Sequence, residues 1–173
     1  MKHIPIILCF VSILSIGCVS LSAQDQPTEQ QNGTFKVDHR IKAQLDSMEY
    51  HYTITNDGDI KLICQISDER TQVVFINSQT QNYQEMEIRE IFSPAALFSA
   101  NNLTLPLAKK LLEENYNKKL GAYQLISSDE NSLLTFTVKA DANSDALTLN
   151  KIIWLVARTS DDLEKEISAT DSY

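Results

Sequence analysis

The stretch from Leu103 to Leu125 constrains the fold more than any other part of the chain, because it encodes a complete helix followed by the start of a strand. Thr104 is a favourable N-cap residue, and Pro106 suits the first helical turn, where a missing N–H costs no hydrogen bond. The residues of the expected apolar helix face follow at helical spacing: Ala108, Leu111, Leu112 and Asn115. The pattern predicts an amphipathic helix that packs against a sheet.

Two residues of this stretch are expected to have structural roles. Asn115 is a polar residue on an apolar face, so we expect its side chain to bond the backbone of a neighbouring strand or loop. A ligand-binding role for Asn115 is the alternative. Gly121 suits the left-handed cap that ends a helix, and a strand is expected directly after it, at Tyr123–Ile126.

Periodicity elsewhere in the chain predicts two more helices and four more strands. The expected elements are a helix at 35–48, strands at 50–54, 60–66, 73–76 and 133–138, and a last helix that Asp145 caps and that runs to Ile167. The all-apolar run Val73–Ile76 indicates a strand covered on both faces. Met86–Ile91 indicates only a short extended segment, which Pro94 is expected to end, and Ala95–Ala100 is expected to form a helical turn.

The order of these elements is α-β-β-β-α-β-β-α, with strands grouped between helices and no strict alternation. Such grouping favours an α+β fold over a doubly wound parallel sheet. We therefore expect an antiparallel sheet, made of a three-strand meander and a hairpin, that the helices cover.

The N-terminus has the pattern of a secretory signal peptide at residues 1–23. A short positive region at Lys2 precedes the apolar run Ile4–Val19, and the small residues of Ser20–Ala23 follow. The apolar run is shorter than the roughly 20 residues that a spanning helix needs. Leu14–Cys18 also resembles a bacterial lipoprotein box, in which Cys18 would be lipidated. A soluble exported form and a lipid-anchored form both remain open.

The remainder divides into a polar leader at 24–34, which we expect to be disordered, a domain at 35–168 and a C-terminal tail at 169–173. We expect an exported protein, periplasmic or secreted, with contact to the membrane only through an anchor at Cys18. Without residues 1–23 the net charge changes from −8 to −9, because one lysine and no acid is lost. This acidity argues against nucleic acid as a partner.

Residues with catalytic or metal-binding potential are few. His39 and His51 have no acid or cysteine at ligand spacing, and Cys64, without a pairing partner after cleavage, is expected to be a small core residue. The chain contains no G-x-S-x-G elbow and no phosphate-binding glycine loop. We therefore expect a protein that is not an enzyme and that uses no cofactor.

A calcium-binding turn is the main alternative to a protein-binding role. Asp141, Asn143 and Asp145 provide oxygen ligands at positions 1, 3 and 5 of a calcium loop. However, Ala146 stands where such a loop needs glycine, and Ile152 stands where it needs a bidentate glutamate. The acidic and amide side chains also suit capping of the last helix. A small-ligand or calcium-binding module of the cell envelope remains the second function hypothesis.

Apolar residues beyond one seam on the last helix indicate a contact surface. Leu147 and Trp154 lie beside the seam, and Arg158 follows one turn later. Aromatic residues and arginine are enriched where proteins bind each other. We expect a protein-interaction surface at Leu147, Trp154 and Arg158, for a protein partner or a second copy of the chain. The alternative is that the loop 78–102 folds over these residues.

The chain resembles the YbjN-domain family, a group described as bacterial sensory transduction regulators, over Phe35–Ile167. Three local patterns carry the resemblance: Leu111–Asn115 followed by Leu120–Tyr123, the Val73–Ile76 strand after a turn at Gly58, and Ser160–Glu164 near the C-terminus. The resemblance implies a fold like that of type III secretion chaperones and a non-enzymatic, protein-binding or regulatory domain that is often dimeric. The signal peptide is a departure from a cytoplasmic regulator.

Overall fold

The structure is a computed structural model that describes residues 36–99, 102–168 and 171–173. The expected signal peptide, the leader and Cys18 lie outside the described residues. The described elements are α1 (His39–Ser47), β1 (Tyr52–Ile54), β2 (Ile60–Ser67), β3 (Arg70–Ile76), β4 (Gln81–Tyr83), β5 (Met86–Ser99), α2 (Leu105–Asn117), β6 (Ala122–Ser127), β7 (Asn131–Asp141) and α3 (Ala146–Ile167). None of the helices among these residues is long and apolar enough to span a bilayer.

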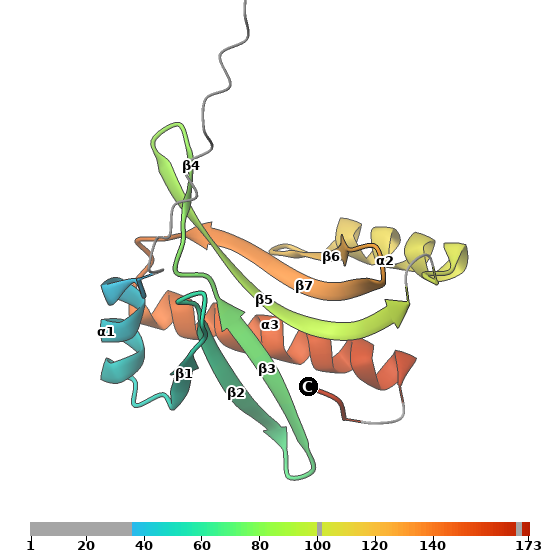
Figure 1. Cartoon of the computed structure of the whole chain (residues 1–173), viewed down its shortest axis with the longest axis horizontal. Coiled ribbons are helices and arrows are strands. Elements are labelled where there is room, and N and C mark those ends of the chain that lie inside the picture. The colour runs from blue at the N-terminus through green and yellow to red at the C-terminus, as the bar shows by residue number, and fades with distance from the viewer. Residues whose placement is uncertain (1–35, 100–101, 169–170) are drawn as a thin grey trace, which may run out of the picture. The chain divides into compact units, whose positions relative to one another are not determined.

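All seven strands form one antiparallel sheet, with the order β1-β2-β3-β5-β7-β6 and with β4 paired to β5 (Figure 1). The predicted α+β class is confirmed, and so are the β1–β2–β3 meander and the β6–β7 hairpin. Two further strands, β4 and β5, lie between the meander and α2. β5 is the long strand that joins the meander to the hairpin, because it pairs with both β3 and β7.

The expected helical turn at Ala95–Ala100 is wrong, since β5 continues through Pro94 to Ser99 and Ala100 lies outside the described residues. A proline can stay in a strand when its nitrogen faces a side that has no strand partner. β5 has such a side here: its ladder with β7 runs from Ile88 to Ser99, with a bulge at Pro94/Ala96, whereas its ladder with β3 contains two residue pairs.

The register explains why the β3–β5 ladder stops at Pro94. The backbone N–H of Asn77 donates to the carbonyl oxygen of Glu90 at 3.0 Å, and Phe75 lies opposite Phe92. Continuing this alternation by two residues would place Val73 opposite residue 94, where the ladder needs an N–H donor. Proline has no such donor, so β3 and β5 separate beyond this point.

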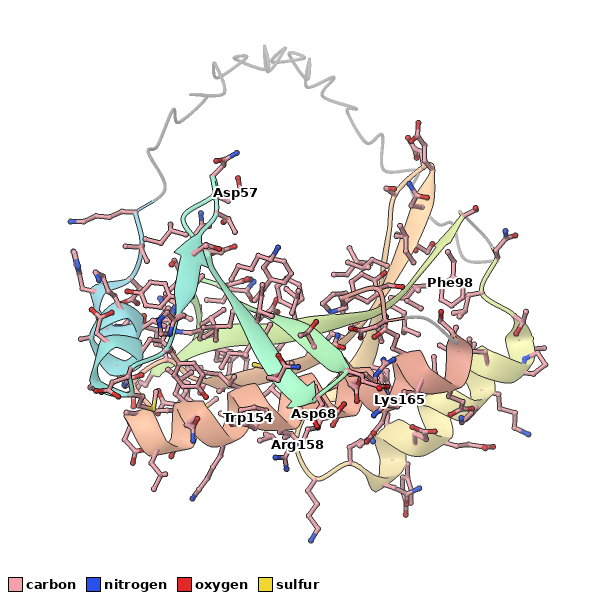
Figure 2. The ribbon with its side chains drawn as sticks, turned by 90° about the horizontal axis from the view of Figure 1, so that it is seen from below. Asp57, Asp68, Phe98, Trp154, Arg158 and Lys165 are labelled. Atoms are coloured by element: carbon pink, nitrogen blue, oxygen red, sulfur yellow. The ribbon has the colours of Figure 1, made fainter. Side chains whose placement is uncertain are left out.

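The core lies between one face of the sheet and the helices, with α3 across β2, β3, β5 and β7. Figure 2 shows the sheet above α3 and α2. The largest fully buried apolar side chains are Phe136, Leu45, Ile60, Leu62, Ile76, Ile91, Leu134 and Ile153. The expectation that Val73–Ile76 is covered on both faces is wrong, because Val74 and Ile76 are buried while Val73 and Phe75 are half-buried on the opposite face.

The two predicted N-caps are confirmed. The Thr104 side chain accepts a hydrogen bond from the Leu107 N–H, and the Asp145 side chain accepts one from the Thr148 N–H. The first helix begins at His39, later than expected, because Asp38 caps it by accepting from the Arg40 N–H. In α2 the expected apolar face is narrower than the pattern indicated. Leu111 is buried, but Leu112 is 70% exposed, since α2 contacts the sheet mainly through the edge strand β6.

Candidate functional site

The face of the sheet opposite the helices carries a set of apolar side chains. Strand residues alternate between two faces, so the neighbours of the buried core residues point to this side. In the described part of the chain, the helices pack on the core side and no helix covers the opposite side. We call its apolar residues the open sheet face: Ile63, Val73, Phe75, Phe92, Leu97, Ile126 and Leu133.

Cross-strand pairing brings these side chains together. Ile63 lies opposite Val73, and the rings of Phe75 and Phe92 stack with centroids 5.2 Å apart. At the other end of the sheet, Leu133 lies between its partners Leu97 and Ile126. The two groups lie on the same face of the sheet, separated by Thr137 and Thr135 of β7, which are 4% and 0% exposed.

Several of these side chains remain accessible to solvent. Ile63 is 66% exposed, Leu97 is 59% exposed and Ile126 is 54% exposed. Single exposed apolar residues are ordinary, but a set that shares one sheet face with no described helix over it is characteristic of a binding surface. The open sheet face can bind another apolar surface, and the residues that compose it are not acid–base groups.

A second apolar feature lies where α2 meets the edge strand β6. A groove of about 210 Å³ runs between them, and its lining includes Leu111, Leu112, Leu125 and Leu134. On the outer side of α2, Leu105 and Tyr116 are 82% and 90% exposed. The position of α2 depends on Asn115, whose Oδ1 accepts from the Tyr123 N–H at 2.7 Å and whose Nδ2 donates to the Tyr123 carbonyl at 3.2 Å.

The role predicted for Asn115 is therefore found, whereas the helix cap predicted at Gly121 is wrong, because α2 ends at Asn117 and its C-cap is Lys118. Asn115 bonds a neighbouring strand, as expected. Gly121 has φ +79°, and a Cβ at this position would lie 2.7 Å from the Phe136 ring and 2.8 Å from the Val138 side chain. Gly121 lies four residues after the end of α2, so its left-handed conformation leads the backbone into β6 and does not cap the helix.

On α3, two residues of the predicted interaction surface, Trp154 and Arg158, pack against each other. Leu147 is 61% exposed at the start of the helix. Trp154 is half-buried against the core, and the Arg158 guanidinium lies 5.3 Å from its ring centroid (Figure 2). Trp154 also lines an open surface depression of about 450 Å³, together with His51 and Glu49. Glu49 has φ +57°, which is uncommon for a residue other than glycine.

The remaining titratable candidates have structural surroundings. His39 is exposed at the first position of α1. Cys64 is 2% exposed in the core, as predicted, and burial raises the pKa of its thiol to about 11. A thiol with a raised pKa forms little thiolate near neutral pH, so Cys64 is a poor nucleophile and metal ligand.

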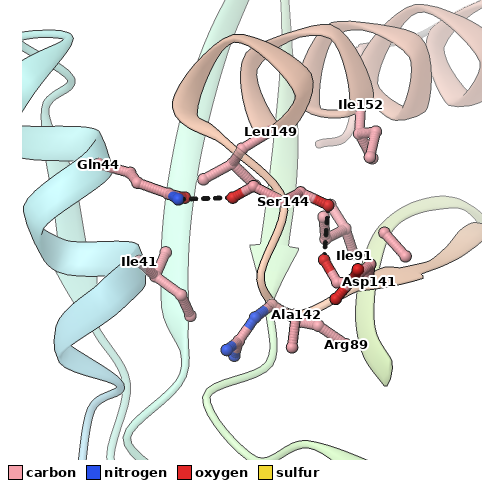
Figure 3. A pocket seen from close by; sticks show the side chains of 10 residues that line it. Ile41, Gln44, Arg89, Ile91, Asp141, Ala142, Ser144, Leu149 and Ile152 are labelled. Carbon is pink, nitrogen blue, oxygen red and sulfur yellow. Dashed lines mark hydrogen bonds between the residues drawn. The ribbon is translucent and has the colours of Figure 1, made fainter. Parts of the chain in front are cut away.

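The calcium-like turn uses its oxygens within the protein, and it lies beside the crevice that Figure 3 shows. Asp141 Oδ1 accepts from the Asn143 N–H, and Asp145 Oδ1 accepts from the Thr148 N–H. Asn143 Oδ1 accepts from the Arg40 guanidinium at 2.7 Å, so a cationic side chain already lies against it. The crevice beside the turn has a volume of about 10 Å³, which is room for one water molecule.

Two charged clusters were not predicted. In the first, Arg40 binds Asp38 and Glu87, and the buried Arg89 donates to Asp38 at 2.5 Å. In the second, Arg70 of β3 binds Asp161 of α3. Each cluster joins residues that are 47 or more positions apart in the sequence, apart from the Arg40–Asp38 pair. No local pattern could have identified them, because the partners are brought together only by folding.

Comparison of the sequence with models of protein families and with curated proteins gave no match.

Proposed function

We propose that this protein is a non-enzymatic, exported protein-binding domain of a chaperone-like or regulatory kind, and that it binds its partner through the open sheet face. The observation that carries the proposal is the one-sided packing of the sheet. Helices cover the face that contains Ile60 and Leu62, while Ile63 on the opposite face is 66% exposed. A partner that covers this face would remove apolar surface from water at about 25 cal/mol per Å².

Three further observations support the proposal. The Cys64 thiol is buried with a raised pKa, which disfavours covalent catalysis by the described cysteine. The resemblance to the YbjN-domain family implies a protein-binding or regulatory role. The signal-peptide pattern at residues 1–23 supports export, to the periplasm or beyond, as a soluble or lipid-anchored protein.

Photocrosslinking in the producing cell tests the surface. A benzophenone amino acid is placed at Ile63 or Ile126 on the open sheet face, or at Leu147 on the helical side, where exposure is similar at 61%. We expect the same crosslinked partner from Ile63 and Ile126 and none from Leu147. Ile63→Lys or Ile126→Lys should then remove the crosslink formed at the other position, because a charge cannot be buried in an apolar interface without a large cost.

The same experiment separates the alternatives. A crosslink from Leu147 alone would move the interface to the helical surface of Leu147, Trp154 and Arg158, and would contradict the proposal. A crosslink to a second copy of the chain would identify a homodimer. Crosslinks at none of the three positions, with the variants folded and exported, would also contradict it.

A second candidate function is small-ligand binding at the depression beside Trp154. The specific observation in its favour is the meeting of His51, Trp154 and the positive-φ residue Glu49 around about 450 Å³ of open space. Backbone conformations of this kind concentrate at functional sites. Nuclear magnetic resonance titration with a small-molecule library tests this candidate. Shifts confined to these residues would support it, and their absence would remove it.

A further inference from the structure

β3 and β5 enclose an opening, because they pair at one end only (Figure 1). The two paired positions are Phe75↔Phe92 and Ile76↔Ile91. Beyond Pro94 the strands separate, so the first part of β3 has β2 on one side and no β5 partner on the other. We call the space between residues 70–74 of β3 and residues 94–99 of β5 the β3–β5 opening. Strand edges that lack a partner are where an extended segment can add.

A polar side chain connects β3 and β5 at the closed end of the opening. Gln72 is fully buried, and its Nε2 donates to Ser93 Oγ at 2.9 Å and to the Pro94 carbonyl oxygen at 2.6 Å. These bonds bridge the strands where the backbone ladder has ended. The Oε1 of Gln72 has no hydrogen-bond partner among the described residues. Buried polar atoms are usually paired, so an unused acceptor here is exceptional.

The chain's own Asp171–Tyr173 lies in the opening, where Figure 1 marks the C-terminal end. The backbone N–H of Thr71, which faces away from β2, donates to Asp171 Oδ2 at 3.2 Å. Thr71 Oγ1 donates to the Tyr173 carbonyl oxygen at 3.4 Å, and the Ser172 N–H donates to Glu164 Oε1 at 2.8 Å. A carboxylate thus satisfies the β3 donor that β5 cannot reach.

The contacts of Asp171–Tyr173 allow another segment to displace it. Arg70 makes its shorter contacts with Asp161 at 2.6 Å and Glu164 at 3.0 Å, and both of those side chains are 1% exposed. Asp171 is the outer carboxylate, at 3.5 Å from Arg70 and 29% exposed. A cavity of about 250 Å³ remains beside Tyr173, lined on β5 by Ala95–Phe98 and on α3 by Ile167. A longer extended segment could fill this space and form more contacts than Asp171–Tyr173 does.

We propose that the β3–β5 opening is a binding site for an extended peptide of a partner protein, one that places a carboxylate beside Arg70 and Thr71 and an aromatic residue two positions later. Asp171–Tyr173 fills the site in this structure and competes with that peptide. Strand addition of this kind takes its affinity from backbone hydrogen bonds and its selectivity from side-chain contacts. The site differs from the open sheet face in its polar contacts, which Arg70 and Thr71 provide, although Val73 and Leu97 belong to both.

Fluorescence anisotropy with a labelled peptide of the sequence Glu166–Tyr173 tests the proposal. The full chain and its Asp171→Ala variant are compared. We expect the variant to bind the peptide at least about tenfold more tightly, because the competing segment occupies the site in most wild-type molecules and affinity falls with the free fraction. A peptide with lysine in place of the aspartate should bind at least about tenfold more weakly than the original.

Hydrogen exchange at the Thr71 N–H measures directly whether the site is occupied. Exchange should be faster in Asp171→Ala and slow again when the peptide is added. If the variant does not release its own segment, a chain that ends at Ser168 takes its place in the same measurement.

Failure of the freed site to bind the peptide, or equal binding of the lysine peptide, would overturn the proposal. A wild-type dimer that Asp171→Ala dissociates would also overturn it, and would assign the site to the tail of a second copy. Crosslinking at Ile63 and Ile126 is expected to be the same in all of these cases.

Discussion

The side-chain amide of Asn115 in α2 pairs with both backbone polar groups of Tyr123 in β6, at 2.7 Å to the N–H and 3.2 Å to the carbonyl oxygen. The amide therefore replaces a neighbouring strand at the outer edge of the sheet. It also holds α2 beside β6, the only strand with which this helix has extensive contact among the described elements.

Replacement of Asn115 should destabilise the protein. Asn115→Leu leaves both polar groups of Tyr123 without this partner, so we expect the free energy of unfolding to fall by about 1–3 kcal/mol. Asn115→Asp keeps the acceptor but loses the donor, and a carboxylate then faces the Tyr123 carbonyl oxygen. Denaturant unfolding measures the change. Asn117→Ala, at the exposed end of the same helix, is the control and should change stability by less than about 0.5 kcal/mol. An Asn115→Leu variant as stable as the wild type would contradict the assignment.

Gly121→Ala should also destabilise the protein, for two separate reasons. The residue has φ +79°, and the added Cβ would lie 2.7 Å from the Phe136 ring. A positive φ alone costs of order 1 kcal/mol for alanine, and the contact requires the ring to move, so we expect a loss of about 2–4 kcal/mol in thermal or denaturant unfolding. Gly58→Ala separates the two causes, because Gly58 has a similar φ of 81°. Equal losses at both glycines would show that the contact with Phe136 adds nothing.

Acid should weaken the protein through the cluster around Arg40. The Arg40 hydrogen bonds lower the pKa of the Glu87 carboxyl from its ordinary 4.5 to about 2, and they also lower the pKa of Asp38. A carboxyl with a lowered folded-state pKa stabilises the protein above its unfolded-state pKa, and this stabilisation is lost as the pH falls toward the folded-state value. The free energy of unfolding should therefore decrease between about pH 4.5 and 2.

Glu87→Gln tests the origin of this decrease. The variant should be less stable than the wild type near neutral pH and should lose less stability on acidification. Glu164 acts in the opposite direction, because burial raises the pKa of its carboxyl and protonation at low pH relieves that cost. If Glu87→Gln leaves the pH dependence of the free energy of unfolding unchanged, the Arg40–Glu87 ion pair does not contribute to it.

Gln72 should tolerate an apolar substitution better than an acidic one. Gln72→Leu loses two hydrogen bonds but also removes the unpaired Oε1, so we expect a cost of about 1–2 kcal/mol. Gln72→Glu has no donor for Ser93 or Pro94 and would bury a charge, so the cost should exceed about 3 kcal/mol at neutral pH and shrink in acid. Urea unfolding at two pH values measures both. A Glu variant as stable as the Leu variant at neutral pH would show that this site is open to water.

Much of the secondary structure could be read from short-range patterns. The caps at Thr104 and Asp145, the apolar seam of α3 and the hairpin turn at Gly58 depend on residues a few positions apart, and these predictions are confirmed. The role of Asn115 was also predictable, since a polar residue on an apolar seam needs a nearby partner. The α+β class followed from the order of the elements.

Local patterns therefore predicted the three helices, most of the strands and many of the core residues, because periodicity and capping act over one or two turns. Three features depended on tertiary contacts: β5 passes through Pro94, Val73 and Phe75 face a side that no described helix covers, and Arg70 meets Asp161. These features depend on which strand lies beside which and on which face a helix covers. That choice is made by contacts between residues far apart in the chain, which no local pattern contains.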